Sequence, residues 1–397
     1  MSGTDESSRA CPALGSPTGR NRVSNSVGRV NAPRTPYFLL DESALERNLA
    51  VVDEIRALSG AKSVLALKCF STWSVFPLMA DHLDGTTSSA PFEARLGRER
   101  FGGEVHAYSV AFSRDDVLEV SKYSDKVIFN SASQLRALGS LVDGPSIGIR
   151  VNPGVSHSHY DLADPARLHS RLGVTDDEEL RAVAPMVDGL MFHFNCENDE
   201  VEDLERLIDA IAERYVDVLD GVSWVSLGGG IAFTAPDYPV GRFCEILRSF
   251  AERFSVQVYL EPGEAVITRS AELVTTVLDV IHNEIPVVIV DAAVEPHLPD
   301  HLIYDTSPFL TAPSAGDIRV EIAGRTCLAG DVFGEYSLAA IPTIGDEVRF
   351  GDAAGYSMVK TSWFNGVAKP SIVVRRLDGS INIVREFGYD DFESDLS

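Results

Sequence analysis

The sequence predicts an α/β protein, a (β/α)₈ TIM barrel followed by a C-terminal β-domain. Two observations support this fold class. Between residues 63 and 263, apolar strand-like runs alternate with amphipathic helical patterns. After residue 265 the runs are β-rich and few helical intervals separate them. The predicted barrel strands are residues 63–68, 84–89, 104–112, 126–130, 146–152, 189–194, 224–230 and 257–263.

Residues 1–34 are rich in Ser, Gly, Pro, Arg and Asn and show no periodicity, which predicts a disordered tail. A transit peptide is the alternative, but Asp5 and Glu6 argue against it. Residues 35–42 include an apolar strand that we expect to join the β-domain, because it precedes the barrel.

The barrel domain is expected to span residues 43–265, and its first helix begins at a capping residue, Asp41 or Ser43. The β-domain is expected over residues 266–397, and Asp378-Gly379 is a hairpin turn signal between its last two strands. The β-rich runs of this domain are residues 271–281, 286–293, 317–324, 347–352, 371–377 and 381–387.

The composition excludes several classes of protein. A formal net charge of −25 argues against nucleic-acid binding and is compatible with a cationic substrate. No apolar stretch is long enough to span a bilayer, and no secretory signal is recognisable. The five cysteines have no CxxC spacing, so we expect reduced thiols in a cytoplasmic protein and no metal site.

Lys68 ends the apolar run Ser63-Val64-Leu65-Ala66-Leu67-Lys68. A lysine at this position either leaves the barrel for solvent or faces a pocket at the strand end. In a pocket, desolvation lowers the pKa of the amine and makes it nucleophilic.

Other candidates lie where barrel strands end, which is the end at which barrel enzymes carry their active sites. The triplet Gly228-Gly229-Gly230 can present backbone N–H groups to a phosphate, or can be a plain tight turn. His193 can be a core residue or can stack on a planar cofactor. Glu261 can form a salt bridge with Arg150 or Lys68, or can pair with a protonated ring nitrogen.

A Schiff-base lysine, a phosphate cradle, a stacking imidazole and a carboxylate for a ring nitrogen together predict a pyridoxal 5′-phosphate site. The sequence has neither a P-loop nor a dinucleotide-binding fingerprint that opens a βαβ unit.

From about residue 35 to its end, the chain resembles the fold-type III pyridoxal phosphate decarboxylases, the ornithine/diaminopimelate decarboxylase superfamily with its alanine-racemase-like barrel. Within them it most resembles the carboxynorspermidine/carboxyspermidine decarboxylase family. The motifs that carry the resemblance are Ala66-Leu67-Lys68, Asp84-Gly85-Thr86-Thr87-Ser88, His193 with Asn195-Cys196-Glu197, Gly228-Gly229-Gly230, Glu261-Pro262-Gly263-Glu264-Ala265, Gly324 with Thr326-Cys327-Leu328-Ala329-Gly330-Asp331, and Asp352-Ala353-Ala354-Gly355-Tyr356.

The resemblance implies a role for each matching residue in the cofactor site. Lys68 would carry the cofactor covalently, His193 would stack on its ring, and Glu261 would pair with the pyridine nitrogen. Gly229 and Gly230, with Tyr356, would bind the phosphate. The complete set of expected cofactor-binding residues is Lys68, Arg150, His193, Gly229, Gly230, Glu261 and Tyr356.

The resemblance also implies a homodimer with shared active sites, into which each subunit donates Cys327 and Asp331. Cys327 would be the catalytic proton donor to the α-carbon, together with Lys68 as the second catalytic residue. Glu264, Asp300 and Asp331 would contact the substrate. The implied reaction is decarboxylation of carboxynorspermidine and carboxyspermidine to norspermidine and spermidine in polyamine biosynthesis.

Glu264 separates this function from its rivals. Related decarboxylases of ornithine or diaminopimelate usually carry arginine at this place in the motif. A glutamate there favours ammonium groups and repels a distal carboxylate. The alternatives are a diaminopimelate-type decarboxylase, a non-enzymatic pyridoxal phosphate carrier, and a racemase on the same barrel.

Overall fold

The computed structural model describes residues 33–397. The tail expected over residues 1–34 therefore lies outside the described residues, apart from its last two. Among the described residues, no helix has the length and apolarity needed to cross a membrane.

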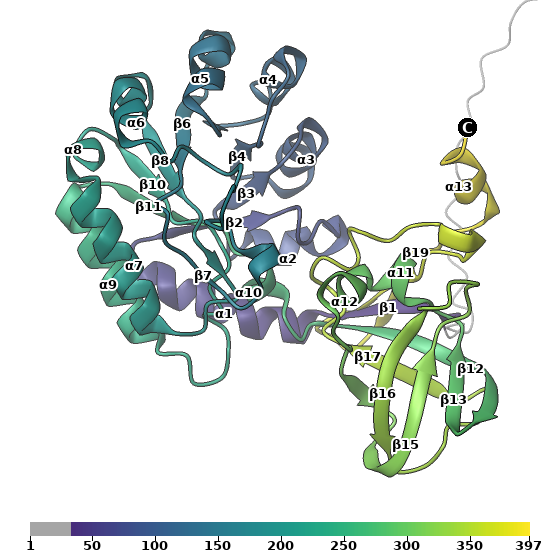
Figure 1. Cartoon of the computed structure of the whole chain (residues 1–397). Coiled ribbons are helices and arrows are strands. Elements are labelled where there is room, and N and C mark those ends of the chain that lie inside the picture. The colour runs from purple at the N-terminus through teal and green to yellow at the C-terminus, as the bar shows by residue number, and fades with distance from the viewer. Residues whose placement is uncertain (1–32) are drawn as a thin grey trace, which may run out of the picture. The chain divides into compact units, whose positions relative to one another are not determined.

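The predicted barrel is confirmed. Its strands pair in parallel and close in the order β10-β11-β2-β3-β4-β5-β6-β8 (Figure 1). Of the third predicted run, residues 104–112, only the first part forms a strand. The second predicted run, residues 84–89, is polar, yet it forms a strand that pairs with both of its neighbours. The barrel strands are β2 (Lys62–Ala66), β3 (Gly85–Ser88), β4 (Glu104–Tyr108), β5 (Lys126–Phe129), β6 (Ser146–Val151), β8 (Gly189–Phe192), β10 (Trp224–Ser226) and β11 (Gln257–Leu260).

Helices lie around the outside of the barrel (Figure 1). The first, α1, begins after Asp41, whose side chain accepts hydrogen bonds from the backbone N–H groups of Ser43 and Ala44. It packs against α9, and both bury an apolar face. The helices are α1 (Glu42–Ser59), α2 (Phe76–Ala80), α3 (Pro91–Leu96), α4 (Arg114–Val120), α5 (Ala132–Leu138), α6 (Asp177–Val183), α7 (Val201–Arg214), α8 (Val216–Leu219), α9 (Val240–Phe254) and α10 (Glu264–Ile267).

The inside of the barrel is layered, because alternate residues of a strand face the same side. A buried cluster of Val64, Ile128, Met191, Trp224 and Tyr259 fills the middle layer. The residue two positions further along a strand reaches the C-terminal end, as Asn130 follows Ile128, Ser226 follows Trp224 and Glu261 follows Tyr259.

The N-terminal end of the barrel is filled by charged and aromatic side chains. Glu104 pairs with Lys62 and, at 2.6 Å from Nζ, with Lys126. The Trp224 indole crosses beside Gly189, where an added Cβ would lie 2.1 Å from ring atoms, so no larger residue fits there. Trp224 Nε1 donates to Ser146 Oγ at 2.9 Å. At this end, the ammonium groups of Lys62 and Lys126 share the Glu104 carboxylate.

The β-rich region after the barrel forms a nine-stranded sheet, with main order β16-β15-β13-β12-β1-β18-β19, in which β17 pairs with β12 and β14. The early strand β1 (Tyr37–Asp41) lies in it, antiparallel to β12 and parallel to β18. Sequence analysis overlooked β14 and β16. The other strands are β12 (Ala271–Asn283), β13 (Ile285–Val290), β14 (Leu310–Ala312), β15 (Ala315–Ala323), β16 (Val332–Leu338), β17 (Glu347–Gly351), β18 (Ser371–Arg375) and β19 (Ile381–Arg385).

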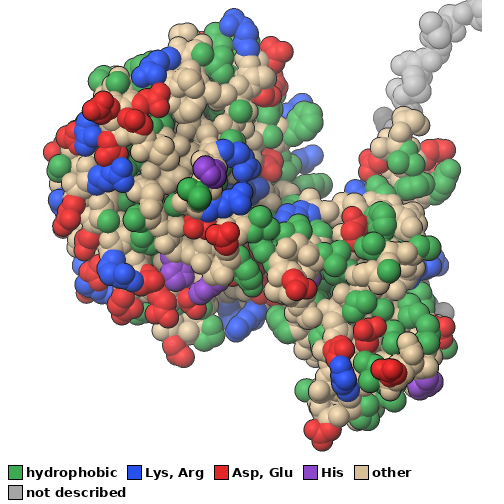
Figure 2. All heavy atoms as spheres, viewed as in Figure 1, with side chains coloured by type: hydrophobic (Ala, Val, Ile, Leu, Met, Phe, Trp, Pro, Cys, Tyr) green, Lys and Arg blue, Asp and Glu red, His purple; other side chains and the backbone are tan. Residues whose placement is uncertain are grey.

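Smaller elements connect these parts. The two-stranded ladder of β7 (His157–Ser158) and β9 (Asn195–Cys196) joins the segments that follow β6 and β8. Short helices near or after the sheet are α11 (Val294–His297), α12 (Pro299–Tyr304) and α13 (Tyr389–Ser394). Acidic and basic side chains are interspersed over the face that Figure 2 shows.

Candidate active site

Lys68 lies just beyond the C-terminal end of β2, separated from it by Leu67. Its side chain is partly open to solvent, and no hydrogen bond or ion pair holds the ammonium among residues 33–397. Desolvation by the protein around it lowers the pKa of Lys68, while the nearby Glu261 carboxylate acts in the opposite direction. The amine is thus unpaired, accessible and easier to deprotonate than an ordinary lysine.

Glu261 follows the end of β11 and is buried. Its two oxygens accept hydrogen bonds from different strands, Oε1 from Ser226 Oγ at 2.6 Å and Oε2 from Thr87 Oγ1 at 3.3 Å. The salt bridge to Arg150 or Lys68, which was the alternative interpretation, does not occur among the described residues. Glu261 is therefore a buried carboxylate that neutral hydroxyl groups orient, and it keeps acceptor capacity for a cationic partner.

Arg150, on β6, is buried and has other partners. Its Nη1 donates to Tyr108 Oη at 2.9 Å, and its Nη2 donates to the His193 carbonyl oxygen at 3.1 Å. Tyr108 Oη in turn donates to Asn130 Oδ1 at 2.8 Å. Arg150 thus fixes the backbone of His193 and adds a positive charge to this end of the barrel.

His193 directly follows β8. Desolvation, with the charges of Lys68 and Arg150 as smaller causes, holds the pKa of its imidazole well below the usual range. The ring is therefore neutral near pH 7, and its buried Nδ1 has no hydrogen-bond partner in the described part of the chain. A neutral imidazole at this end of the barrel can stack on a planar cofactor, and its Nδ1 is free to take part in a hydrogen bond.

The glycine triplet follows β10 and packs closely against its neighbours. A Cβ on Gly229 would lie 2.3 Å from the Glu261 carbonyl oxygen, and one on Gly230 would lie 2.2 Å from the Asn195 carbonyl oxygen. Gly230 also has a φ of +79°. The triplet is therefore a tight turn for steric reasons, and this same turn keeps side chains away from the backbone, as a phosphate cradle requires.

Glu264 begins α10, and burial is the main cause that raises its pKa to about 7. The charges of Asp352, Glu197 and Asp300 raise it further, whereas a hydrogen bond from Cys69 lowers it. Cys69 Sγ donates to Glu264 Oε2 at 3.6 Å. Glu264 has no cationic partner among residues 33–397, so it can receive a positively charged ligand.

Tyr356 brings the C-terminal part of the chain to this group. Its backbone N–H donates to the carbonyl oxygen of Cys69, next to Lys68, at 3.0 Å. Desolvation raises the pKa of its hydroxyl well above the usual value, so the hydroxyl stays protonated and can donate a hydrogen bond.

The two other expected substrate-contacting acids already have partners. Asp300 pairs with Lys360, whose Nζ lies 2.5 Å from Oδ1. Asp331 is only 3% exposed, and its carboxylate accepts hydrogen bonds from Val294 N, Thr326 N and Thr326 Oγ1. The expected contact of Asp331 with substrate stays a prediction; within the chain, this carboxylate holds its own loop in shape through these hydrogen bonds.

Cys327 lies on the loop that Asp331 organises, and its thiol is exposed and unpaired. Its backbone N–H donates to Asn365 Oδ1 at 3.3 Å. No described contact within the chain brings it to Lys68.

The residues present fit the expected cofactor. An unpaired amine, a buried carboxylate without a cation, an orphaned imidazole nitrogen and a turn with no room for side chains converge at one end of the barrel. Sequence reasoning missed the residues that orient this group, namely Thr87, Tyr108, Asn130 and Ser226. Alternate residues of a barrel strand face the interior. Following every second residue along each strand could have found them, since each is the polar residue that ends such a set.

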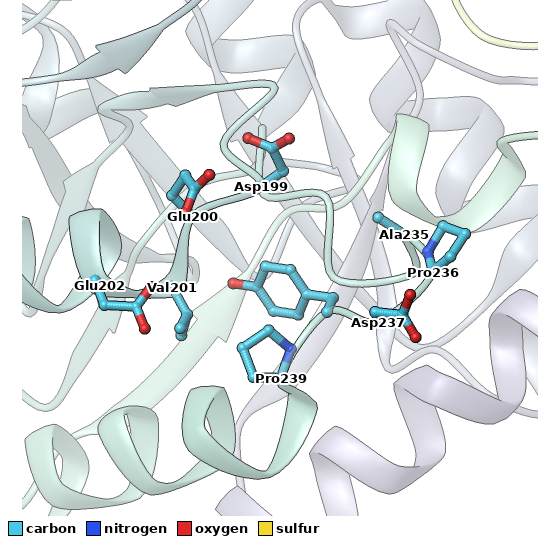
Figure 3. Close-up of a pocket in the computed structure, with 9 residues that line it drawn as sticks. Asp199, Glu200, Val201, Glu202, Ala235, Pro236, Asp237 and Pro239 are labelled. Atoms are coloured by element: carbon cyan, nitrogen blue, oxygen red, sulfur yellow. The ribbon is translucent and has the colours of Figure 1, made fainter.

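A separate surface pocket of about 270 Å³ lies between the segment before α7 and the segment before α9 (Figure 3). It contains none of the residues described above. Its lining is acidic and includes Asp199, Glu200, Glu202 and Asp237 around Tyr238.

The known proteins to which this chain is similar are decarboxylases. Residues 238–354 match the family described as "Pyridoxal-dependent decarboxylase, C-terminal sheet domain". The chain is 50% identical to the carboxynorspermidine/carboxyspermidine decarboxylase of Herminiimonas arsenicoxydans over 364 residues, which are 91% of this chain and 99% of that protein. It is 31% identical to the carboxyaminopropylagmatine decarboxylase of Synechocystis sp. over 375 residues, which are 93% and 97% of the two chains.

A crystal structure of carboxynorspermidine decarboxylase from Campylobacter jejuni, complexed with norspermidine, has the same fold. It superposes with a TM-score of 0.84 at 31% sequence identity and covers 91% of this chain and 100% of that one. The similarity therefore extends through both the barrel and the sheet.

Proposed function

Because this chain belongs to the carboxynorspermidine/carboxyspermidine decarboxylase family, we propose that it is a carboxy-lyase that converts carboxynorspermidine to norspermidine and carboxyspermidine to spermidine. The reaction depends on pyridoxal 5′-phosphate and belongs to polyamine biosynthesis. The observation that carries the proposal is Glu264, a half-buried carboxylate that has no cationic partner among residues 33–397 and lies beside the group that fits the cofactor.

The cofactor, when bound, accepts the electron pair that loss of CO₂ leaves on the α-carbon. Lys68 would hold it through the ε-amino group. Glu261, fixed by Ser226 and Thr87, would accept a hydrogen bond from the ring nitrogen and keep that nitrogen protonated. His193 would lie against the ring, and its neutral state spares the protonated ring a repulsive charge.

The phosphate would lie at the backbone of Gly229 and Gly230 and accept a hydrogen bond from Tyr356. Arg150 would contribute positive charge and hold the His193 backbone in place. These assignments are supported by the lack of room for a Cβ at the two glycines and by the protonated state of the Tyr356 hydroxyl.

The carbon that loses CO₂ needs one proton from a positioned acid. We assign this proton to the thiol of Cys327 from a second subunit. The assignment is supported by the exposed, unpaired thiol and by the buried Asp331 carboxylate, which gives its loop a defined shape. The enzyme is accordingly proposed to be a homodimer with shared sites. Its unpaired described cysteines agree with a cytoplasmic location.

Substrate selection would rest on Glu264. Its raised pKa means that a bound ammonium stabilises the carboxylate, and the binding energy partly offsets the cost of burying that charge. A ligand that ends in a second carboxylate would meet Glu264 and the charges of Asp352, Glu197 and Asp300. Asp300 would act through its pair with Lys360 rather than as a free carboxylate.

The test is CO₂ release with product identification for carboxynorspermidine, carboxyspermidine, carboxyaminopropylagmatine and diaminopimelate, each supplied to the holoenzyme. We expect turnover of the two carboxytriamines and none of diaminopimelate. The carboxyaminopropylagmatine arm tests the substrate named for the Synechocystis relative. Turnover of diaminopimelate alone, or loss of α-carbon chirality without CO₂ release, would overturn the proposal.

A further inference from the structure

Two histidines and an aspartate meet on the loops outside the decarboxylase site, in a chain whose cysteines alone predicted no metal centre. A ring nitrogen of His157, a ring nitrogen of His159 and a carboxylate oxygen of Asp199 all lie within 4.8 Å of one another. We propose that these three residues bind one divalent transition-metal ion of the Zn²⁺ class.

Asp203 fixes the tautomer of the His157 ring. Its Nδ1 lies 3.0 Å from Asp203 Oδ2, and the carboxylate can only accept, so Nδ1 carries the proton. Nε2 is then the nitrogen with a free lone pair. It is buried and has no hydrogen-bond partner among residues 33–397. A carboxylate that fixes the far nitrogen of a histidine is the usual outer partner of a metal-bound imidazole.

The other two residues complete an open site. His159 Nε2 lies 3.5 Å from Asp199 Oδ1, and the two histidine rings meet edge to face with centroids 5.1 Å apart. His159 is 50% exposed and Asp199 is 54% exposed, so both side chains can move the short distance that metal–ligand bonds of about 2 Å require. Two imidazoles and one carboxylate are a common donor set for Zn²⁺, with water as the fourth ligand.

The setting favours a cation. Asp199 also lines the acidic pocket in Figure 3, together with Glu200, Glu202 and Asp237. The Asp203 carboxylate lies against His157 and also pairs with Arg206. These charges attract a divalent ion to the loop and offset its charge once it is bound.

The ion would join two segments that follow neighbouring barrel strands. His157 lies on β7, Asp199 follows β9, and the two strands pair through His157↔Asn195 and Ser158↔Cys196. Asn195 also supports the turn at Gly230. A metal at this position would fasten the ladder beside the active site without taking part in the reaction.

The test uses the untagged full-length holoenzyme, cleared of metal by a chelator. After Zn²⁺ is added back, we expect the protein to retain one equivalent through gel filtration and to melt about 3 °C higher with saturating Zn²⁺. With Co²⁺ added instead, the protein should show the visible absorption of bound Co²⁺. His157→Ala and His159→Ala should weaken Zn²⁺ binding by at least about 100-fold, and Asp203→Asn by about 10- to 100-fold.

Two controls make the result specific. His282→Ala removes an exposed histidine on β12 and should bind Zn²⁺ as the parent does. Cys327→Ser removes an exposed thiol and should also leave binding unchanged. Binding that survives His159→Ala but is lost in Cys327→Ser, or no retained metal in the parent, would overturn the proposal. Far-UV circular dichroism and cofactor absorbance of each variant report whether it is folded.

Discussion

The two ends of the barrel surround their lysines with different partners. Lys62 begins β2 at the N-terminal end and pairs with Glu104, which also binds Lys126 and accepts a hydrogen bond from Tyr259 Oη at 2.9 Å. Lys68, six positions later, has no such partner among the described residues. The segment from Lys62 to Lys68 thus carries a paired ammonium at one end of the barrel and an unpaired amine at the other. The difference teaches that partners, rather than residue type, decide which lysine amine is held in an ion pair and which stays available for chemistry.

Of the substitutions that test this difference, Lys68→Ala should have the largest effect. We expect activity to fall on the order of 10³-fold or more, because the residue proposed to hold the cofactor is lost. Lys62→Ala should keep both the cofactor and the activity. Reduction with borohydride followed by peptide mass spectrometry locates the adduct, and an adduct that persists in Lys68→Ala would contradict the assignment.

Glu104→Gln should instead destabilise the N-terminal end of the barrel. It leaves two partly buried ammonium groups beside each other, so we expect the free energy of unfolding to fall by about 3 kcal/mol. Contacts with His106, Lys126 and Lys62 hold the pKa of Glu104 far below its usual value. The stabilisation is therefore present above about pH 4.5 and is lost as the pH falls below it.

Denaturant titration of the parent and of Glu104→Gln at two pH values measures this effect. Cofactor absorbance should be the same in both proteins before unfolding. Equal stability at pH 7 would mean that solvent already screens the cluster.

Glu264→Gln tests the C-terminal end of the barrel. Loss of the proposed charged hydrogen bond to a substrate ammonium should raise KM by about 10- to 100-fold, with a smaller change in kcat. Glu264→Arg should abolish binding of the triamine. Steady-state kinetics with carboxynorspermidine separate the two parameters, and an unchanged KM in Glu264→Gln would remove this residue from the substrate site.

The pH dependence of ligand binding should show the smallest effect. The pKa of Glu264 is raised to about 7, so its carboxylate forms as the pH rises through that value. Affinity for norspermidine, which stays cationic, should increase about tenfold from pH 6 to pH 8 and then level off. Calorimetric titrations across this range should give a flat profile for Glu264→Gln; a matching rise in that variant would point to another group.

The same raised pKa has the opposite effect on the free protein. Between the unfolded value of 4.5 and the folded value of about 7, the folded state holds the proton more tightly. Stability of the ligand-free protein therefore decreases as the pH rises through this interval. Ligand affinity and stability of the free protein should change in opposite directions.

Much of this fold could be predicted from local pattern. Alternating strands and helices indicated the barrel, and even the polar run at residues 84–89 forms β3. The strands β14 and β16 were missed because their side chains are largely half-buried or exposed, so no apolar run marks them. Backbone pairing with β17 and β15 decides their conformation.

The site could be predicted only as far as residue type allowed. Lys68, His193, Glu261 and Glu264 lie at one end of the barrel because parallel strands bring their C-terminal ends together. The burial of Asp331 could not be predicted, since a carboxylate in a Gly-rich loop has the same sequence signature whether it binds a ligand or its own backbone. Hydrogen-bond partners distant in sequence, such as Thr87 with Glu261, are likewise visible only in three dimensions.

The pairing of β1 with β18 has a consequence for synthesis on the ribosome. Tyr37–Leu40 emerge early, yet their parallel partner, Ser371–Val374, is translated more than 300 residues later. The barrel can complete itself while this apolar segment still waits for its neighbour. A nascent chain that stalls before β18 would therefore present an unpaired edge to chaperones and to other nascent chains.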